Sequence, residues 1–177
     1  MKTISLVFLG ILTLLAIIAV IENGWITGAI TGTAQANVQS TVQITLTTDT
    51  VDFGTVNNND VVNTTGNSSK GFYIQNDGNV RVNVTIKATD LWTTVSNPSS
   101  YYMFAVNGTT EGICYDGANS VTTYTNMPND ATPTLAIARL NFTNSCDTAK
   151  VEIGIVVPSE EPAGAKSSTV TFTGSQA

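Results

Sequence analysis

The feature that most constrains the fold of this chain is an alternation of apolar and polar side chains with a period of two. It is clearest at residues 80–87 (VRVNVTIK), where valine and isoleucine occupy the even positions and polar residues the odd ones. A period of two belongs to a β-strand with one buried and one solvated face. We therefore expect residues 80–87 to form a central strand of a half-solvated antiparallel sheet.

The same alternation, or a short apolar run between turn residues, predicts further strands along the chain. The expected ranges are 41–47, 51–56, 71–75, 101–106, 112–115, 135–142, 150–157 and 168–173, with a short edge strand around Val61 and Val62. Residues 76–79 (NDGN) should form a hairpin turn with positive φ, and residues 89–99 should connect two sheets. Short strands at this spacing predict an all-β fold, an Ig-like or jelly-roll-type antiparallel β-sandwich of Greek-key type, with no helix outside the N-terminal segment.

The composition agrees with an all-β surface protein and excludes several function classes. Charged residues make up only 11 % of the chain, and the polar surface comes largely from threonine, asparagine and serine, of which threonine suits a solvated strand face. The net charge of −6 repels phosphate backbones, so nucleic-acid binding is not expected. The chain has no histidine, which excludes Ser-His-Asp and Cys-His catalysis. Because the carboxylate pairs Asp49/Asp52 and Glu160/Glu161 lie in turns, we predict no catalytic residue and no enzyme.

The N-terminal segment predicts export from the cytosol. Lys2 precedes an apolar run from Ile4 to Ile21, about 18 residues, which is long for a signal peptide and nearly long enough to cross a ~30 Å hydrocarbon core. Ala34-Gln35-Ala36 is a small-x-small sequence that makes Ala36 a candidate cleavage site. Two interpretations stay open: residues 1–36 are a cleaved signal, or they are a retained membrane or pilus-core helix with a Gly/Thr spacer. In both, residues 37–177 form a single extracellular β-sandwich domain.

Two cysteines, Cys114 and Cys146, are the only ones in the chain. In an exported protein without histidine they predict a disulfide rather than a metal site, and a pair of buried thiols is the alternative.

Because the N-terminal segment predicts export, we also expect covalent glycans. Sequons of the type Asn-x-Ser/Thr occur at Asn63, Asn67, Asn83, Asn107 and Asn141. By alternation, Asn83 lies on the solvent side of its strand.

Two weaker hypotheses concern ligands. The oxygen-rich turns at 57–60, 77–79 and 116–119 are of the kind that Ca²⁺ uses, but the same residues are ordinary turn formers, so we predict no cofactor, with Ca²⁺ as the alternative. The aromatic residues Trp92, Tyr73, Tyr101 and Tyr102 are compatible with a platform for sugars or with packing between sheets.

Three parts of the sequence carry a resemblance to known proteins. They are VDFGTV at 51–56, GFYIQNDGNV at 71–80 leading into VNVTI at 82–86, and the ending from Pro162-Ala163-Gly164 to TVTFT at 169–173. Together they resemble secreted prokaryotic surface sandwiches, in particular the TasA-like biofilm-fibre proteins and the archaeal bundling pilins. The sequence Ile26-Thr27-Gly28 after the apolar run is similar to small archaeal envelope proteins.

The resemblance implies a subunit of a cell-surface filament (a pilus or fibre) or coat, with roles in biofilm formation and cell adhesion. Its partner is itself, because an N-terminal strand of one copy completes the sheet of the next. The candidate donor is Asn37–Thr48, with Val42, Ile44 and Leu46 on its apolar face, or the stretch Gly28–Ala36. The same alternation fits the chain's own first strand. The alternatives are a retained-helix pilin or membrane-anchored surface protein, with the membrane reached through residues 4–21, and a glycan-binding adhesin module.

Overall fold

A computed structural model describes residues 33–65 and 71–177 of the chain. Residues 39–177 form one compact unit. The described residues ahead of it, 33–38, contain no helix or strand, and their side chains are exposed. The predicted apolar segment 4–21 and the sequon at Asn67 lie outside the described residues.

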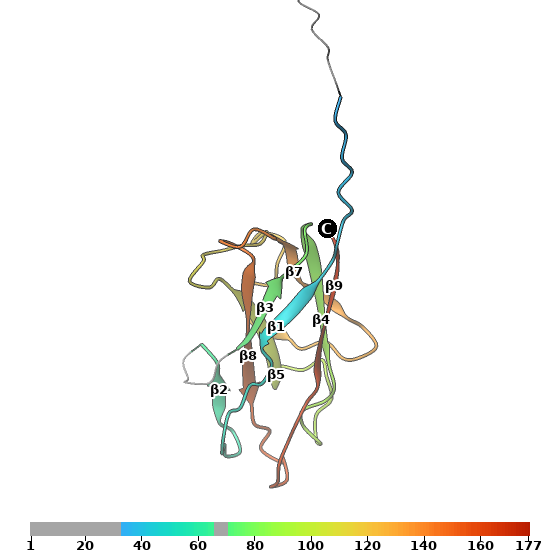
Figure 1. Ribbon diagram of the computed structural model, residues 1–177. Helices are drawn as coiled ribbons and strands as arrows, with labels where there is room; N and C mark the ends of the chain where they lie inside the picture. The colour runs from blue at the N-terminus through green and yellow to red at the C-terminus, as the bar shows by residue number, and fades with distance from the viewer. Residues whose placement is uncertain (1–32, 66–70) are drawn as a thin grey trace, which may run out of the picture. The chain divides into compact units, whose positions relative to one another are not determined.

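The described residues are all-β, and they contain no helix (Figure 1). The strands are β1 (Ile44–Thr48), β2 (Val61–Asn63), β3 (Phe72–Asn76), β4 (Val82–Ala88), β5 (Tyr102–Asn107), β6 (Thr125–Asn126), β7 (Thr134–Leu140), β8 (Thr148–Val156) and β9 (Val170–Gln176). All their pairings are antiparallel, and they form two sheets. The predicted all-β class and the strand at 80–87 are confirmed.

The larger sheet is built around β8. Its order is β1-β3-β8-β5-β6, and β2 pairs with β8 as well. On one side of β8, β3 pairs with residues 148–151 and β2 with residues 154–156, so two short strands share one edge. The smaller sheet has the order β7-β4-β9, which places β4 at its centre as the alternation predicts.

The core lies between the two sheets. Along β4, every even residue from Val82 to Ala88 is buried and every odd one is half-exposed, so the periodicity in the sequence is the periodicity of burial. Phe72 of β3 and Phe172 of β9 meet edge to face across the core, with ring centroids 5.5 Å apart. Burying an aliphatic side chain contributes about 1.5–3 kcal/mol, and these sheets bury many.

The turn at 76–79 differs from the prediction. It connects β3 in the larger sheet to β4 in the smaller one, so it is not a hairpin, and the φ of Gly78 is not positive. Glycine is required there because a Cβ would lie 2.3 Å from the carbonyl oxygen of Thr41. The turn is held by Asn76, whose side chain is buried and donates to the carbonyl oxygens of Val80 (2.9 Å) and Leu140 (3.1 Å).

Two predicted strands are absent from the described structure. Residues 51–53 alternate as a strand does, but the alternation breaks at Gly54, whose φ is 66°, and the next core-packed side chain is Val56. None of these residues is assigned to a strand. Residues 112–115 contain only the end of an isolated bridge, Thr109 to Gly112. Residues 112–115 instead lie beside β7 without forming a ladder, since the N–H of Asn141 donates to the carbonyl of Cys114 and the N–H of Asp116 to that of Ala138.

The edge strands β1 and β9 lie on the same side of the sandwich (Figure 1). A Cβ at Gly174 of β9 would lie 3.2 Å from the side chain of Ile44 in β1, which shows how closely the two sheets approach there. The far edge of the smaller sheet is covered, because Asp116 and Val121 donate backbone hydrogen bonds to β7. Among the described strands, β9 therefore has a free edge.

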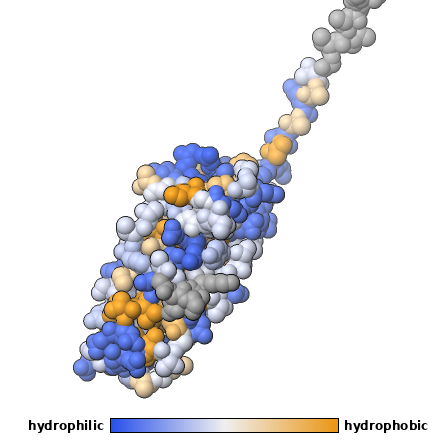
Figure 2. Space-filling view, turned by 90° about the vertical axis from the view of Figure 1, so that its left-hand side faces the viewer, coloured by the Kyte–Doolittle hydropathy of each residue, from blue (hydrophilic) through white to orange (hydrophobic). Residues whose placement is uncertain are grey.

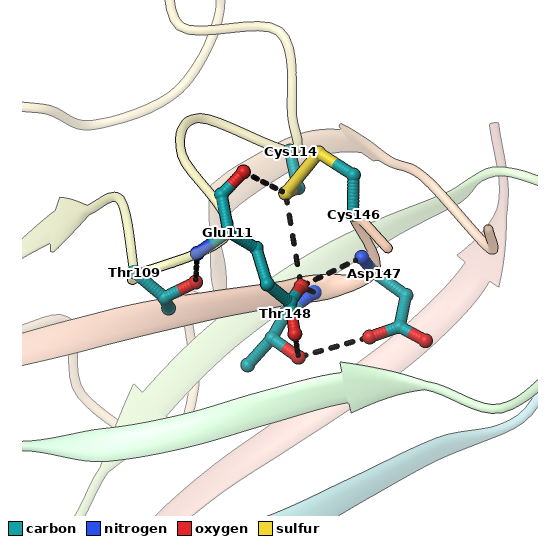
Figure 3. Close-up of a disulfide and its surroundings, with 6 residues drawn as sticks. All are labelled: Thr109, Glu111, Cys114, Cys146, Asp147 and Thr148. Atoms are coloured by element: carbon teal, nitrogen blue, oxygen red, sulfur yellow. Dashed lines mark hydrogen bonds between the residues drawn. A yellow bond between two sulfur atoms is a disulfide. The ribbon is translucent and has the colours of Figure 1, made fainter. Parts of the chain in front are cut away.

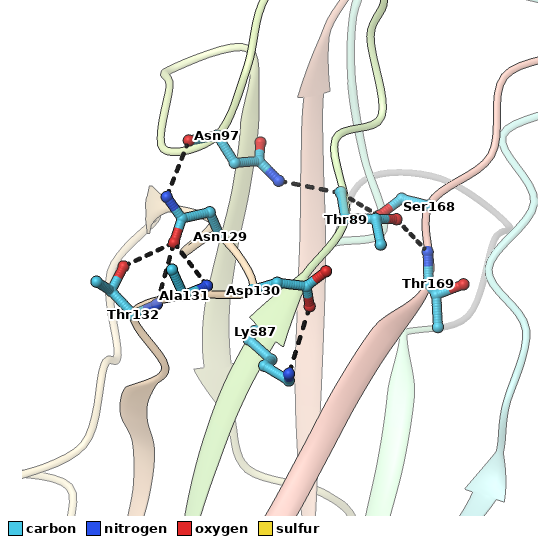
Figure 4. A network of polar contacts seen from close by, with 9 residues as sticks. All are labelled: Lys87, Thr89, Asn97, Asn129, Asp130, Ala131, Thr132, Ser168 and Thr169. Atoms are coloured by element: carbon cyan, nitrogen blue, oxygen red, sulfur yellow. Dashed lines mark hydrogen bonds and ion pairs between the residues drawn. The ribbon is translucent and has the colours of Figure 1, made fainter.

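Polar contacts secure the end of the smaller sheet beyond β4 (Figure 4). The backbone N–H of Thr169 donates to the hydroxyl of Thr89 (2.9 Å), and the hydroxyl of Ser168 donates to the carbonyl of Thr89 (2.7 Å). Lys87 and Asp130 form a surface ion pair at 3.5 Å. The two hydrogen bonds to Thr89 hold the segment before β9 against the end of β4, and the ion pair joins β4 to the loop before β7.

The surface is predominantly hydrophilic on the face shown in Figure 2, with separate hydrophobic patches. Val61 and Ile113 are the most exposed large apolar side chains within residues 39–65 and 71–177.

Candidate functional site

A groove of about 920 Å³ opens into the core between the two sheets. Its walls are two extended segments, residues 49–58 on one side and residues 161–168 on the other. Its floor consists of core side chains, namely Phe72, Leu91, Trp92, Tyr102, Ile153, Ile155, Val157 and Val170. The volume is at the upper end of the range of small-molecule pockets. Both walls carry polar and charged residues as well as apolar ones.

The first wall, residues 49–58, belongs to neither of the two sheets. The side chains of Val51 and Phe53 point toward the core, whereas Asp52 and Gly54 are exposed. A hydrogen bond from the Gly54 N–H to the Asp52 carboxylate (2.8 Å) and the left-handed φ of 66° at Gly54 bend the segment locally. The strand-like alternation of this wall therefore ends at Gly54, since the next side chain packed against the core is Val56.

The second wall is held in place by Glu161. Its carboxylate accepts hydrogen bonds from the backbone N–H and hydroxyl groups of Thr93 and Thr94, at 2.5–3.1 Å, and pairs with the ammonium of Lys166 at 2.5 Å. Burial raises the pKa of the Glu161 carboxyl, but the hydrogen bonds from Lys166, Thr94 and Thr93 outweigh burial and hold the pKa far below its ordinary value. Glu161 is therefore ionised at neutral pH and fixes the wall to the loop that follows β4.

Two of the aromatic residues considered as a sugar platform, Trp92 and Tyr102, are buried in the core. Trp92 and Tyr102 are only 6 % and 4 % exposed, and the Trp92 indole donates to the carbonyl of Tyr101 (2.9 Å). Burial raises the pKa of Tyr102. Both side chains form the floor of the groove, so they are not displayed as an exposed platform.

The candidate donor Asn37–Thr48 is partly paired within its own chain. Residues 44–48 form β1 against β3, and the carbonyls of Thr41 and Gln43 accept hydrogen bonds from the turn after β3. Ile44 packs against the core, whereas Val42 and Leu46 are 40 % and 38 % exposed. The apolar face of this segment is thus only partly covered in a single copy.

Cys114 and Cys146 form the predicted disulfide, with their Cα atoms 5.1 Å apart (Figure 3). The bond joins the loop after β5 to the start of β8. Beside it, the Glu111 carboxylate accepts hydrogen bonds from the backbone N–H groups of Asp147 (3.1 Å) and Thr148 (3.2 Å). The sequence contains no local signal for this role of Glu111, because its partners are far away along the chain.

The described sequons lie in different environments. Asn107 is exposed at the end of β5, whereas Asn63 in β2 is half-buried. Asn83 lies on the outer face of β4 and accepts a hydrogen bond from the backbone N–H of Arg139 (3.0 Å), and Asn141 follows β7. Their glycosylation stays a prediction.

In two of the oxygen-rich turns, the carboxylate accepts a hydrogen bond from a residue of the same turn. Asp60 accepts a hydrogen bond from the N–H of Asn57 (2.7 Å), and Asp116 accepts one from the side chain of Asn119 (2.7 Å). Within the part of the chain that the structure describes, no group of three or more Asp, Glu, His or Cys side chains converges as metal ligands would.

The candidate cleavage site at Ala36 is described and exposed. No helix in the described ranges is both long and apolar enough to cross a membrane. The apolar run from Ile4 to Ile21, which is the candidate signal or membrane helix, lies outside those ranges.

Comparison with protein-family models and with curated proteins finds no match to this sequence. The interpretation of the groove therefore rests on its geometry.

Proposed function

We propose that this chain is an extracellular structural protein, the subunit of a cell-surface filament or coat, whose copies assemble by strand donation and have no catalytic activity. In this proposal the domain is an Ig-like or jelly-roll-type sandwich that follows an N-terminal apolar helix, and the resemblance to TasA-like fibre proteins and archaeal bundling pilins points the same way. The observation that carries the proposal is the open groove between residues 49–58 and 161–168.

The groove has the two properties that an inserted strand requires. Its floor offers apolar contact through the half-exposed side chains of Leu91 and Val170. Its first wall, residues 49–58, belongs to neither sheet, and its apolar side chains Val51, Phe53 and Val56 are half-exposed against the core. A strand from another copy could lie between the two walls and cover these half-exposed apolar side chains.

The donor is the stretch that precedes Gln39 in a second copy. Residues 39–48 already pair with the turn after β3 and with β3, so donating them would require an exchange between copies. Ahead of them, the even positions from 28 to 38 are Gly, Ile, Gly, Ala, Ala and Val, and the odd positions are mostly polar. This alternation suits a strand with one apolar face, and Val38 is 81 % exposed.

A charge on the apolar face of the donor tests this proposal. We expect Val38→Asp to abolish assembly, because an aspartate cannot enter an apolar groove without a large desolvation cost. The matched control is Val61→Asp on β2, since Val61 is also highly exposed (72 %) and lies outside the groove. Light scattering and electron microscopy measure assembly, and circular dichroism confirms that both variants fold. Filaments of Val38→Asp equal to the wild type would refute the donor role.

Cross-linking tests the acceptor. A copy with Ala36→Cys is mixed with a copy carrying a cysteine in a groove wall, at Thr55 or Ser167. The control copy carries the cysteine at Thr134, which is exposed at the start of β7 and outside the groove. We expect covalent dimers with the two wall positions only. Equal linkage at Thr134 would mean random collision.

The native N-terminus decides between the two donor segments. Intact mass and N-terminal sequencing of protein taken from cell surfaces, before and after glycan removal, should show a chain that begins upstream of Gly28. A start at Asn37 would remove the proposed donor and leave exchange of Asn37–Thr48 as the route. The same masses report glycosylation directly.

A further inference from the structure

A second, smaller cleft lies on the surface away from the groove. It has a volume of about 290 Å³ and is lined by Arg81, Cys114, Tyr115, Asp116, Arg139 and Asn141. Arg81 and Arg139 are the only arginines in a chain whose net charge is −6. Their meeting in one cleft concentrates positive charge on an otherwise acidic protein.

Three neighbouring chain segments build the cleft. In the smaller sheet, Val82 of β4 lies opposite Leu140 of β7, so Arg81 and Asn141 lie at the same end of this strand pair. On the other side of β7, the N–H of Asn141 donates to the carbonyl of Cys114 (2.9 Å). The disulfide from Cys114 to Cys146 ties this third segment down, so the cleft rests on a cross-linked frame.

The backbone at Arg139 directs its side chain. The pairing of β4 with β7 shifts register between Val82 and Val84, which leaves an extra residue on β7 next to Arg139. Arg139 itself has a φ of 55°, in the left-handed region that long side chains rarely adopt. A bulge of this kind re-aims a side chain, and its strain points to a function.

The two guanidinium groups have free donors. Lys87, Lys150 and Lys166 each form an ion pair with a carboxylate, at 3.5, 2.8 and 2.5 Å. By contrast, neither arginine side chain forms an ion pair or hydrogen bond with the residues at 33–65 and 71–177. Two forks of N–H donors in one cleft match a carboxylate, which accepts bidentate hydrogen bonds.

The other residues that line the cleft favour a ligand with more features than a negative charge. The side-chain hydrogen bond from Asn119, together with backbone contacts and the charge of Arg139, lowers the pKa of the Asp116 carboxyl, so Asp116 is ionised at neutral pH. This carboxylate partly offsets the positive charge of the two arginines, and a simple inorganic anion has no hydrogen-bond donor to offer it. A ligand with hydroxyl groups could donate to it and to the Asn141 side chain, while the half-buried ring of Tyr115 offers an apolar face.

We infer that this two-arginine cleft binds a carboxylate-bearing sugar of the uronic-acid type. The carboxylate pairs with Arg81 and Arg139, hydroxyl groups donate to Asp116 and Asn141, and the sugar ring lies against Tyr115. The volume suits one sugar unit, since it is at the lower end of the range for small-molecule pockets. This site is independent of the proposed strand donation, because it shares no residue with the groove.

Titration of the full-length, unglycosylated chain with D-glucuronate tests the inference, with D-glucose and acetate as matched probes that lack the charge or the hydroxyl groups. By isothermal titration calorimetry or NMR shifts, we expect glucuronate to bind at least about tenfold more tightly than either. Equal binding of glucose would overturn the role of the arginines, and equal binding of acetate would overturn the role of the sugar hydroxyls.

Variants complete the test. Arg81→Gln and Arg139→Asn should each weaken glucuronate binding about tenfold or more, and asparagine is chosen at position 139 because it tolerates the left-handed conformation. Lys87→Gln removes one positive charge from the same sheet outside the cleft and should leave binding unchanged. Unchanged binding in folded Arg81→Gln, confirmed by its thermal unfolding, would refute the site.

The sugar has two sources, a separate saccharide or a glycan attached at Asn141, which lines the cleft. Protein from native cell surfaces distinguishes them. If the attached glycan fills the cleft, added glucuronate binds only after glycan removal. If the ligand is separate, glucuronate binds both forms equally. Failure of glucuronate to bind either form would overturn the inference.

Discussion

At the scale of the residue, the buried carboxylate of Glu161 holds the second wall of the groove, residues 161–168, in place. It gathers two hydroxyl groups, two backbone N–H groups and an ammonium from Thr93, Thr94 and Lys166. Because the pKa of Glu161 is lowered on folding, its stabilising contribution is complete above the ordinary value of 4.5 and is lost as the pH falls below that value toward the folded pKa.

We expect Glu161→Gln to lower the melting temperature by several degrees at pH 7, because the amide NH₂ would face groups that are themselves donors. The wild type should lose melting temperature more steeply than this variant between about pH 4.5 and 3. Glu160→Gln is the matched control, since Glu160 is adjacent and exposed. Thermal unfolding across this range is the measurement, and parallel pH profiles for wild type and Glu161→Gln would contradict the assignment.

The hydrogen bonds of the buried Asn76 side chain give a second prediction at the scale of the residue. Its side chain is fully buried, donates to the carbonyl groups of Val80 and Leu140, and accepts from the N–H of Gly78. Asn76→Ala would leave these buried groups without partners and should lower the free energy of unfolding by about 2–4 kcal/mol. Denaturant unfolding measures this change. Gln75→Ala is the control, because Gln75 is half-exposed and should cost less than about 1 kcal/mol.

At the scale of the element, the disulfide is the cross-link between the loop after β5 and the start of β8. Replacing both cysteines with serine should lower the free energy of unfolding by about 3.7 kcal/mol, the chain-entropy value for a loop of this length. The chain has no other cysteine, so reduced wild type and the double variant should unfold at the same denaturant concentration. A clear difference between them would show that the serines, rather than the lost bond, cause the effect.

At the scale of the whole molecule, the groove links assembly to stability. Only a folded copy can accept a strand, so assembly stabilises the domain by mass action. At a donor concentration about 100 times the dissociation constant the gain is about 2.7 kcal/mol, or a rise in melting temperature of roughly 5–10 °C. Calorimetry should therefore show a concentration-dependent melting temperature for the wild type and a constant, lower one for Val38→Asp. A constant value for both would argue against strand donation.

The local sequence was sufficient for much of the fold. The alternation at 80–87 predicted the central strand of the smaller sheet, and the two cysteines predicted the disulfide. The connection at 89–99 does join the two sheets, and the short strand at Val61 and Val62 exists. These features depend on side-chain period, turn residues and cysteine count, all of which are written into neighbouring residues or into composition.

Only the tertiary structure decided the sites. Residues 51–56 were predicted as a strand but line a groove, because Gly54 bends the segment and a ladder needs a partner that no local pattern specifies. The turn at 76–79 has hairpin residues, yet it crosses between sheets because β4 pairs with β7 and β9. Arg81 and Arg139 are far apart in sequence and meet only through antiparallel pairing and a bulge. Periodicity determines which face of a segment is buried, whereas long-range pairing determines what lies beside it, and both the groove and the cleft depend on the latter.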